Sequence, residues 1–159
     1  MKTFEQEFDY ARPLGSGIHG SVYQISDIHA AKFYDEQNVS DPDKECKIAK
    51  ELYKNNINVP KPEGVFKIDL KAKNTFLSQK HAFVMEYLPG YILEDVPSNE
   101  IKRLGLNELA EIELEKARKL GFLTIDSEPR RNNSNQIWCP DRNRIYIIDF
   151  VNWVDGRKL

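Results

Sequence analysis

Three glycines, a lysine and an acid in the first third of the chain could together bind a phosphate group. The stretch LGSGIHGSV carries the pattern GxGxxG at Gly15, Gly17 and Gly20, and Lys32 follows in AAK. Glycines let the backbone approach phosphate oxygens without intervening side chains, and a lysine ammonium then neutralises phosphate charge. Such a lysine needs an acid to hold it, and Glu45 in KECKIAKEL is a candidate.

The glycine pattern alone is a weak signal, because a glycine-rich turn without any ligand gives the same spacing. A dinucleotide-binding fold needs a helix after the last glycine and an acid further along, and Asp35 lies at about the right distance. However, the residues after Gly20, SVYQIS, favour a strand, so this alternative fails. The same glycine pattern also occurs in a β-hairpin lid over nucleotide phosphates, which has a valine two residues beyond the last glycine, and Val22 occupies that position.

A second group of polar residues lies in the last third of the chain. Asp126 follows a long helical pattern in LGFLTIDSEPRRNNSNQIW, and Asp149 ends the apolar stretch IYIID. Carboxylates and amides can bind magnesium, and a carboxylate can orient a hydroxyl group. An aspartate at a strand end can equally cap a turn or bond local amides, so this group alone does not identify a site.

The elements that must position these residues are strands in the first third of the chain. FDYARPLGSG, GSVYQIS and HAAKFYD are predicted strands, and a helix begins near Asp41 with Pro42 in its first turn. Cys46, Ala49, Leu52 and Tyr53 give this helix one apolar face. INVPKPEGVFKID and KHAFVMEYLPG are extended, and LKAKNTFLSQ between them is predicted to be a hairpin loop.

The rest of the chain predicts a long helix and a small hairpin. The helical pattern is SNEIKRLGLNELAEIELEKARKLG, with Ser98 or Asn99 as cap, Gly105 as a point of division and Gly121 as its end. QIW and IYII flank the turn CPDRN. The order of elements predicts an α+β protein, with a five-stranded antiparallel sheet and one helix followed by a reduced helical part with a β-hairpin.

The first half resembles the small lobe of the protein-kinase-like superfamily. The resemblance is carried by GSGIHGSV, AAK, Glu45 in KECKIAKEL and the hinge FVMEYLPG. It implies that Lys32 grips the α- and β-phosphates of ATP and pairs with Glu45, with Glu51 as the rival partner. It also implies an adenine site, whose residues are a gatekeeper Met85, backbone groups of Glu86 and Leu88, and the ring neighbours Val22 and Ala30.

The resemblance extends more weakly through the second half. It implies an ATP-binding lobe over residues 1–88 and a reduced catalytic lobe over 89–159. Asp126 would orient the acceptor hydroxyl, and Asp149 in IDF would bind Mg²⁺. A metal-site asparagine is also implied, for which Asn132 is favoured slightly and Asn135 is the rival.

Three departures from the family pattern stand out. Thr124 and Ile125 replace the first two residues of the HRD motif, and Val151 replaces the glycine of DFG. The chain also ends at Leu159, which leaves no room for an activation segment or a peptide-docking floor. A reduced lobe of this kind would expose apolar surface, with Trp153 as a natural part, for a protein partner or a homodimer.

The expected function is ATP-dependent phosphotransfer, with magnesium, to a protein serine or threonine hydroxyl. Two alternatives stay open: a pseudokinase acting as a nucleotide-binding or protein-interaction module, and a kinase of a small molecule. The missing docking floor favours both alternatives. The basic pair Arg130-Arg131 would favour an acidic or phosphorylated acceptor, but only weakly.

Composition bounds the remaining function classes. The 159 residues are 40% hydrophobic and 30% charged, as in a globular protein, and the net charge of −2 gives no bulk attraction to nucleic acid or anionic membranes. Cys46 and Cys139 lack the spacing of a zinc site, so reduced thiols are expected. Without an apolar leader or membrane span, the predicted location is cytoplasmic, and export without a recognisable signal stays open.

Overall fold

The structure is a computed structural model that describes residues 5–8, 11–17, 20–34, 41–70, 81–124 and 135–158. The chain divides into two compact units, and neither is one continuous stretch. The first unit consists of Met1–Lys47 and Lys61–Tyr87, and the second of Ile48–Pro60 and Leu88–Leu159. The boundary between Tyr87 and Leu88 lies in the predicted hinge.

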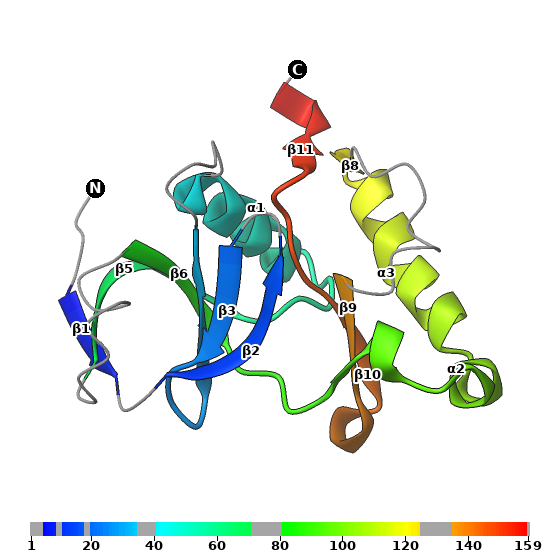
Figure 1. Ribbon diagram of the computed structural model, residues 1–159. Helices are drawn as coiled ribbons and strands as arrows, with labels where there is room; N and C mark the ends of the chain where they lie inside the picture. The colour runs from blue at the N-terminus through cyan, green and yellow to red at the C-terminus, as the bar shows by residue number, and fades with distance from the viewer. Residues whose placement is uncertain are drawn as a thin grey trace. The chain divides into compact units, whose positions relative to one another are not determined.

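In the first unit, the described residues form a six-stranded sheet in the order β1-β5-β6-β4-β3-β2 (Figure 1). The strands are β1 (Glu5–Phe8), β2 (Arg12–Gly17), β3 (Gly20–Gln24), β4 (His29–Phe33), β5 (Pro62–Leu70) and β6 (His81–Glu86). Five of them pair antiparallel, as predicted, whereas β1 joins β5 in parallel. The predicted strand FDYARPLGSG, residues 8–17, is confirmed over Arg12–Gly17 as β2, whereas its first residue, Phe8, is the last residue of β1 at the opposite edge. The predicted hairpin loop lies largely at 71–80, outside the described residues.

The two faces of this sheet carry different residues. Register pairs Val22 with Lys32, and Ala30 with Met85, so these four side chains lie on one face. The buried core occupies the other face, because side chains alternate along a strand. The core residues are Ile25, Ala31, Phe33, Ile68, Ala82 and Val84. The Val22, Ala30 and Met85 side chains, expected beside the adenine ring, thus lie on the face opposite this cluster.

Helix α1 (Pro42–Lys54) begins where the sequence predicts it. The Asp43 amide donates to Asp41 Oδ1 at 2.9 Å, which is the bond of an N-cap, and Pro42 occupies the first helical position. After the helix, Asn56 adopts a left-handed φ of 62°, a conformation that asparagine tolerates at a helix end. The sequence placed this whole helix in the first half, whereas the structure assigns its residues from Ile48 onward to the second unit.

Hydrogen bonds explain why residues 48–60 belong to the second unit. Asn58 accepts a bond from the Ile147 amide at 2.8 Å and donates its own amide to Glu113 Oε2 at 3.0 Å. Ile57 and Val59, on either side, are buried. The segment after α1 is therefore bonded to residues more than fifty positions further along the chain. A local sequence pattern could not have predicted that it belongs to the second unit.

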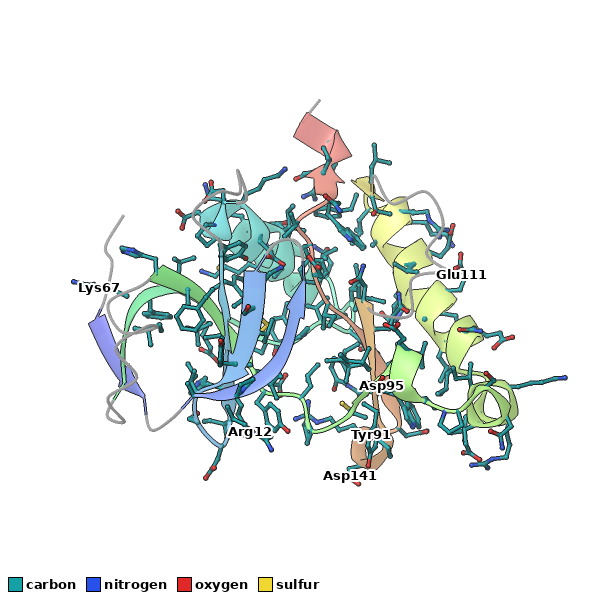
Figure 2. The ribbon with its side chains drawn as sticks, viewed as in Figure 1. Arg12, Lys67, Tyr91, Asp95, Glu111 and Asp141 are labelled. Carbon is teal, nitrogen blue, oxygen red and sulfur yellow. The ribbon has the colours of Figure 1, made fainter. Side chains whose placement is uncertain are left out.

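The second unit contains the predicted long helix in two pieces, α2 (Ser98–Leu104) and α3 (Leu106–Lys119). Gly105 separates them with a left-handed φ of 64°, as the sequence suggested. The strands β7 (Tyr91–Ile92), β9 (Gln136–Cys139) and β10 (Arg144–Ile147) form a small sheet in the order β10-β9-β7. Asp141 lies in the turn between β9 and β10, at the tip of the predicted hairpin (Figure 2).

The core of the second unit lies between α3 and the β9–β10 hairpin (Figure 1). It contains Leu93, Leu106, Ala110, Trp138 and Ile145. A two-stranded ribbon adds β8 (Phe122–Thr124) to β11 (Trp153–Asp155), strands that the sequence pattern did not reveal. Trp153 packs edge-on against Phe150, with ring centroids 5.5 Å apart, and is only 6% exposed. The hypothesis that Trp153 forms part of an exposed partner surface is therefore wrong.

Glu113 is a buried acid whose loss is expected to destabilise the protein. Its carboxylate accepts the Asn58 amide at 3.0 Å and the Lys116 ammonium at 2.8 Å. Glu113→Ala removes both acceptors and is expected to lower the free energy of unfolding in urea by about 1–3 kcal/mol. Glu113→Gln keeps an oxygen that can accept the Asn58 amide, so its free energy of unfolding should fall less than that of Glu113→Ala. Equal losses in the two variants would instead assign the stabilisation to the ion pair with Lys116.

Candidate functional site

The structure forms the ion pair that the sequence predicted between Lys32 and Glu45. Lys32 Nζ lies 2.9 Å from Glu45 Oε1 and 3.2 Å from Oε2, so the ammonium contacts both carboxylate oxygens. Strand β4 supplies the lysine, and the first turn of α1 supplies the glutamate. The rival acid, Glu51, lies two turns further along α1 and faces Arg157 at 3.5 Å instead.

The pair is buried and has a third member that sequence analysis missed. Lys32 and Glu45 are 6% and 3% exposed, and the Tyr34 hydroxyl donates to Glu45 Oε1. The Lys32 ammonium also lies 5.3 Å from the centre of the Tyr34 ring. Tyr34 follows Lys32 by two positions, so strand alternation already placed both side chains on one face. That spacing was the signal that could have identified it.

The two glycines next to the turn of the β2–β3 hairpin pair across the ladder, Gly17 opposite Gly20. A Cβ at Gly20, where φ is 144°, would overlap the Phe33 carbonyl, so the local fold itself requires glycine there. At Gly15, in contrast, a Cβ would meet no described atom within 4 Å. Packing among the described residues therefore explains the glycine at 20 but not the glycine at 15.

Three of the predicted adenine residues, Met85, Glu86 and Leu88, lie at the end of β6 or just beyond it. Met85 is half-buried and pairs with Ala30 in register. The Glu86 amide donates to the Lys61 carbonyl at 2.9 Å, and Glu86 Oε1 accepts the Lys61 amide at 3.2 Å. Leu88, the first residue of this stretch in the second unit, is buried against Cys139 and Tyr146, and its carbonyl accepts the Gly90 amide.

In the second unit, Asp149 and Asn135 lie at the same end of the β9–β10 hairpin. The Ile148 amide donates to the Asn135 carbonyl at 2.9 Å, which extends the pairing of Gln136 with Ile147 by one position. Asp149 follows directly. The hairpin thus brings together the predicted metal ligand and one of the two candidate asparagines, while Asp126 and Asn132 lie outside the described residues.

Asp149 has an unusual backbone for a residue with a side chain. Its φ of 65° is left-handed, which disfavours most residues but is tolerated by aspartate and asparagine. The Val151 amide donates to Asp149 Oδ1 at 3.3 Å and so supports this turn. A conformation of this kind is often found where function requires it. The left-handed turn directs the chain from β10 toward β11.

The comparisons with known proteins leave the site to be interpreted from its own residues. None of the helices formed by the described residues has the length and apolar character that a membrane crossing requires. No family model and no curated protein matches the sequence.

Proposed function

We propose that the protein is an ATP- and magnesium-dependent phosphotransferase of the protein-kinase-like type, acting on a protein serine or threonine hydroxyl. The observation that carries this proposal is the buried Lys32–Glu45 pair, 2.9 Å apart, on the sheet face opposite the core. Its position beside the glycine hairpin β2–β3 adds support, because Val22 of that hairpin pairs with Lys32 in register.

A buried ion pair supports a functional role better than a structural one. Removing two charges from water costs several kcal/mol per ion, and well-packed apolar residues often serve stability as well or better. A lysine held by a glutamate in a sheet offers a fixed positive charge, which suits the binding of phosphate oxygens. The Tyr34 hydroxyl donates to Glu45 Oε1, the same oxygen that lies 2.9 Å from Lys32 Nζ, so two groups hold the carboxylate in place.

In this proposal each group of the site has one task. Lys32, fixed by Glu45, would neutralise the α- and β-phosphates, and Asp149 with Asn135 would supply oxygen ligands for magnesium. Bound magnesium would neutralise charge that develops on the phosphate oxygens. Asp126 would orient the acceptor hydroxyl and receive its proton, while the bond from the γ-phosphorus to the acceptor oxygen forms and the bond to the β–γ bridging oxygen breaks.

We favour Asn135 as the second metal ligand, although the sequence slightly favours Asn132, which lies outside the described residues. Asn135 lies beside Asp149 through the Ile148–Asn135 hydrogen bond. The bond brings Asn135 next to the residue that precedes Asp149, so both residues lie at one end of the hairpin, as ligands of a shared ion must. Replacing Asn135 with alanine should therefore weaken magnesium-dependent nucleotide binding more than the same change at Asn132.

Transfer of label from γ-labelled ATP tests the proposal. The purified protein is incubated with labelled ATP and magnesium, alone and with cell lysate, and the products are separated into proteins and small molecules. Label on serine or threonine that is lost in Asp126→Ala supports the proposed function. Label on a small molecule alone would assign a small-molecule kinase. Binding of ATP without transfer to either would assign a nucleotide-binding module.

A further inference from the structure

We propose that Arg157 is a positioning residue, which fastens the segment after β11 to helix α1 and thereby orients the end of α1 that carries Glu45. The proposal rests on the proposed function where it concerns nucleotide binding. Its structural part concerns only described residues of the second unit and the continuity of α1. The segment is η5 (Gly156–Lys158), a single turn of 3-10 helix.

Two glycines bring η5 against the loop that follows α3. The Gly156 amide donates to the Gly121 carbonyl at 2.8 Å. A Cβ at Gly156 would lie 2.5 Å from that carbonyl oxygen, closer than real Cβ atoms come to backbone atoms. A Cβ at Gly121, where φ is 99°, would lie 2.8 Å from Arg157 Cγ. Both positions therefore require glycine for this close approach, which is evidence that η5 has one defined place.

The Arg157 guanidinium is held in one orientation before it reaches α1. Its Nε and Nη2 donate to the two Asp155 oxygens at 2.8 and 2.9 Å, and its Cζ lies 4.8 Å from the centre of the Phe122 ring. Such a two-pronged pair with a carboxylate fixes a guanidinium plane. The Asp155 hydrogen bonds, helped by Glu51, raise the pKa of Arg157 above its ordinary value.

The same guanidinium reaches α1. Arg157 Nη2 lies 3.5 Å from Glu51 Oε2, and the two side chains are 42% and 41% exposed. An isolated pair with such exposure contributes little, chiefly because two flexible side chains must be ordered. Here the Arg157 side chain is already ordered by Asp155 and Phe122, so it loses less conformational entropy when it pairs with Glu51.

Helix α1 connects this contact to the candidate site. Glu51 and Glu45 lie on one continuous helix, separated by roughly 9 Å along its axis at 1.5 Å per residue. Glu45 pairs with Lys32 in the first unit, whereas Glu51 belongs to the second. A restraint on Glu51 limits rotation and displacement of the helix, and so restrains the carboxylate that fixes Lys32.

The test compares Arg157→Gln with Arg118→Gln as a matched control. Arg118 is also a half-exposed arginine with two acidic partners, Glu111 and Glu115, but these lie on its own helix, α3 (Figure 2). Two quantities are measured in each variant: the dissociation constant for Mg-ATP and the hydrogen exchange of α1 amides. Arg157→Gln is expected to raise the dissociation constant about 5-fold, the lower end for coupled sites, and to speed α1 exchange. Arg118→Gln should change neither.

A double-mutant cycle shows whether Arg157 acts through Glu51. Glu51→Gln should reproduce the effect of Arg157→Gln, and the double variant should be no worse than either single variant. Gly156→Ala provides a second route, because it displaces η5 while keeping both charges, and it should likewise raise the dissociation constant. Unchanged α1 exchange in Arg157→Gln and Gly156→Ala would overturn the proposal, and so would fully multiplicative effects of Glu51→Gln and Arg157→Gln.

Failure of the proposed function gives a different result. If the wild-type protein binds no Mg-ATP, the phosphotransferase proposal is wrong, whereas α1 exchange still decides the role of Arg157. Faster α1 exchange in Arg157→Gln, reproduced by Glu51→Gln and absent in Arg118→Gln, would then support the restraint without the nucleotide.

Discussion

The Lys32→Met variant is expected to lose phosphoryl transfer by a factor on the order of 10² to 10³, the usual effect of removing one preorganised charge from a reacting site. Lys32 is held by Glu45 at 2.9 Å, so the variant also leaves a buried carboxylate without its cation. Breaking a buried pair in this way costs about 3–5 kcal/mol of stability. Both label transfer from γ-labelled ATP and unfolding in urea are therefore measured for Lys32→Met.

The double variant Lys32→Met with Glu45→Leu separates the two effects. With both charges replaced by apolar side chains, stability should return to near the wild-type value or exceed it, because the desolvation of two ions is also removed. Phosphoryl transfer should remain lost. Transfer that recovers together with stability would show that Lys32 contributes to folding alone, and the proposed role of the lysine would be withdrawn.

The second large effect is expected from Asp149→Asn, which should abolish the magnesium-dependent part of nucleotide stabilisation. At a Mg-ATP concentration 100 times its dissociation constant, the wild-type protein should gain about 2.7 kcal/mol. For a chain of this size the corresponding rise in melting temperature is roughly 5–10 °C. In Asp149→Asn the rise should be the same with and without magnesium, since an amide lacks the charge that attracts the ion.

Asparagine is the appropriate replacement because it preserves the backbone. It tolerates the left-handed φ of 65° as aspartate does, and its Oδ1 can still accept the Val151 amide. The ligand-free melting temperature should therefore stay close to the wild-type value. A magnesium-dependent rise that persists in Asp149→Asn would remove Asp149 from the metal site. A matched change at Asp141, exposed in the hairpin turn, serves as the control and should leave the rise intact.

Much of the local structure could be predicted because single residues determine it. Asp41 and Pro42 fix the start of α1 through an N-cap bond, and Gly105 divides α2 from α3 because it adopts a left-handed conformation. In these two cases the information lies within a few residues of the feature. The partner of Lys32 could also be predicted, because the resemblance to a kinase small lobe implied Glu45 and kept Glu51 as its rival.

The remainder depends on contacts between distant parts of the chain. β1 pairs in parallel with β5, and the sequence of β1 gives no indication that β5 is its partner. Trp153 lies in β11, which pairs with β8. Each of these strands has three residues, which is too short for an alternating pattern of apolar residues to be recognised in the sequence. The place of Asn135 near Asp149 depends on the register of the hairpin, which spacing along the sequence does not give.

The division of the chain between its two units has a consequence for biosynthesis. The ribosome makes the residues of α1 early, yet Asn58, just beyond the helix, bonds to Glu113 and Ile147, which emerge much later. Until then the neighbouring apolar residues Ile57 and Val59 lack the surroundings that bury them. A nascent chain that ends near Tyr87 therefore contains residues 48–60 without the rest of the second unit, to which they belong. We expect that stage of synthesis to be the one most dependent on chaperones, since transiently exposed apolar segments favour aggregation.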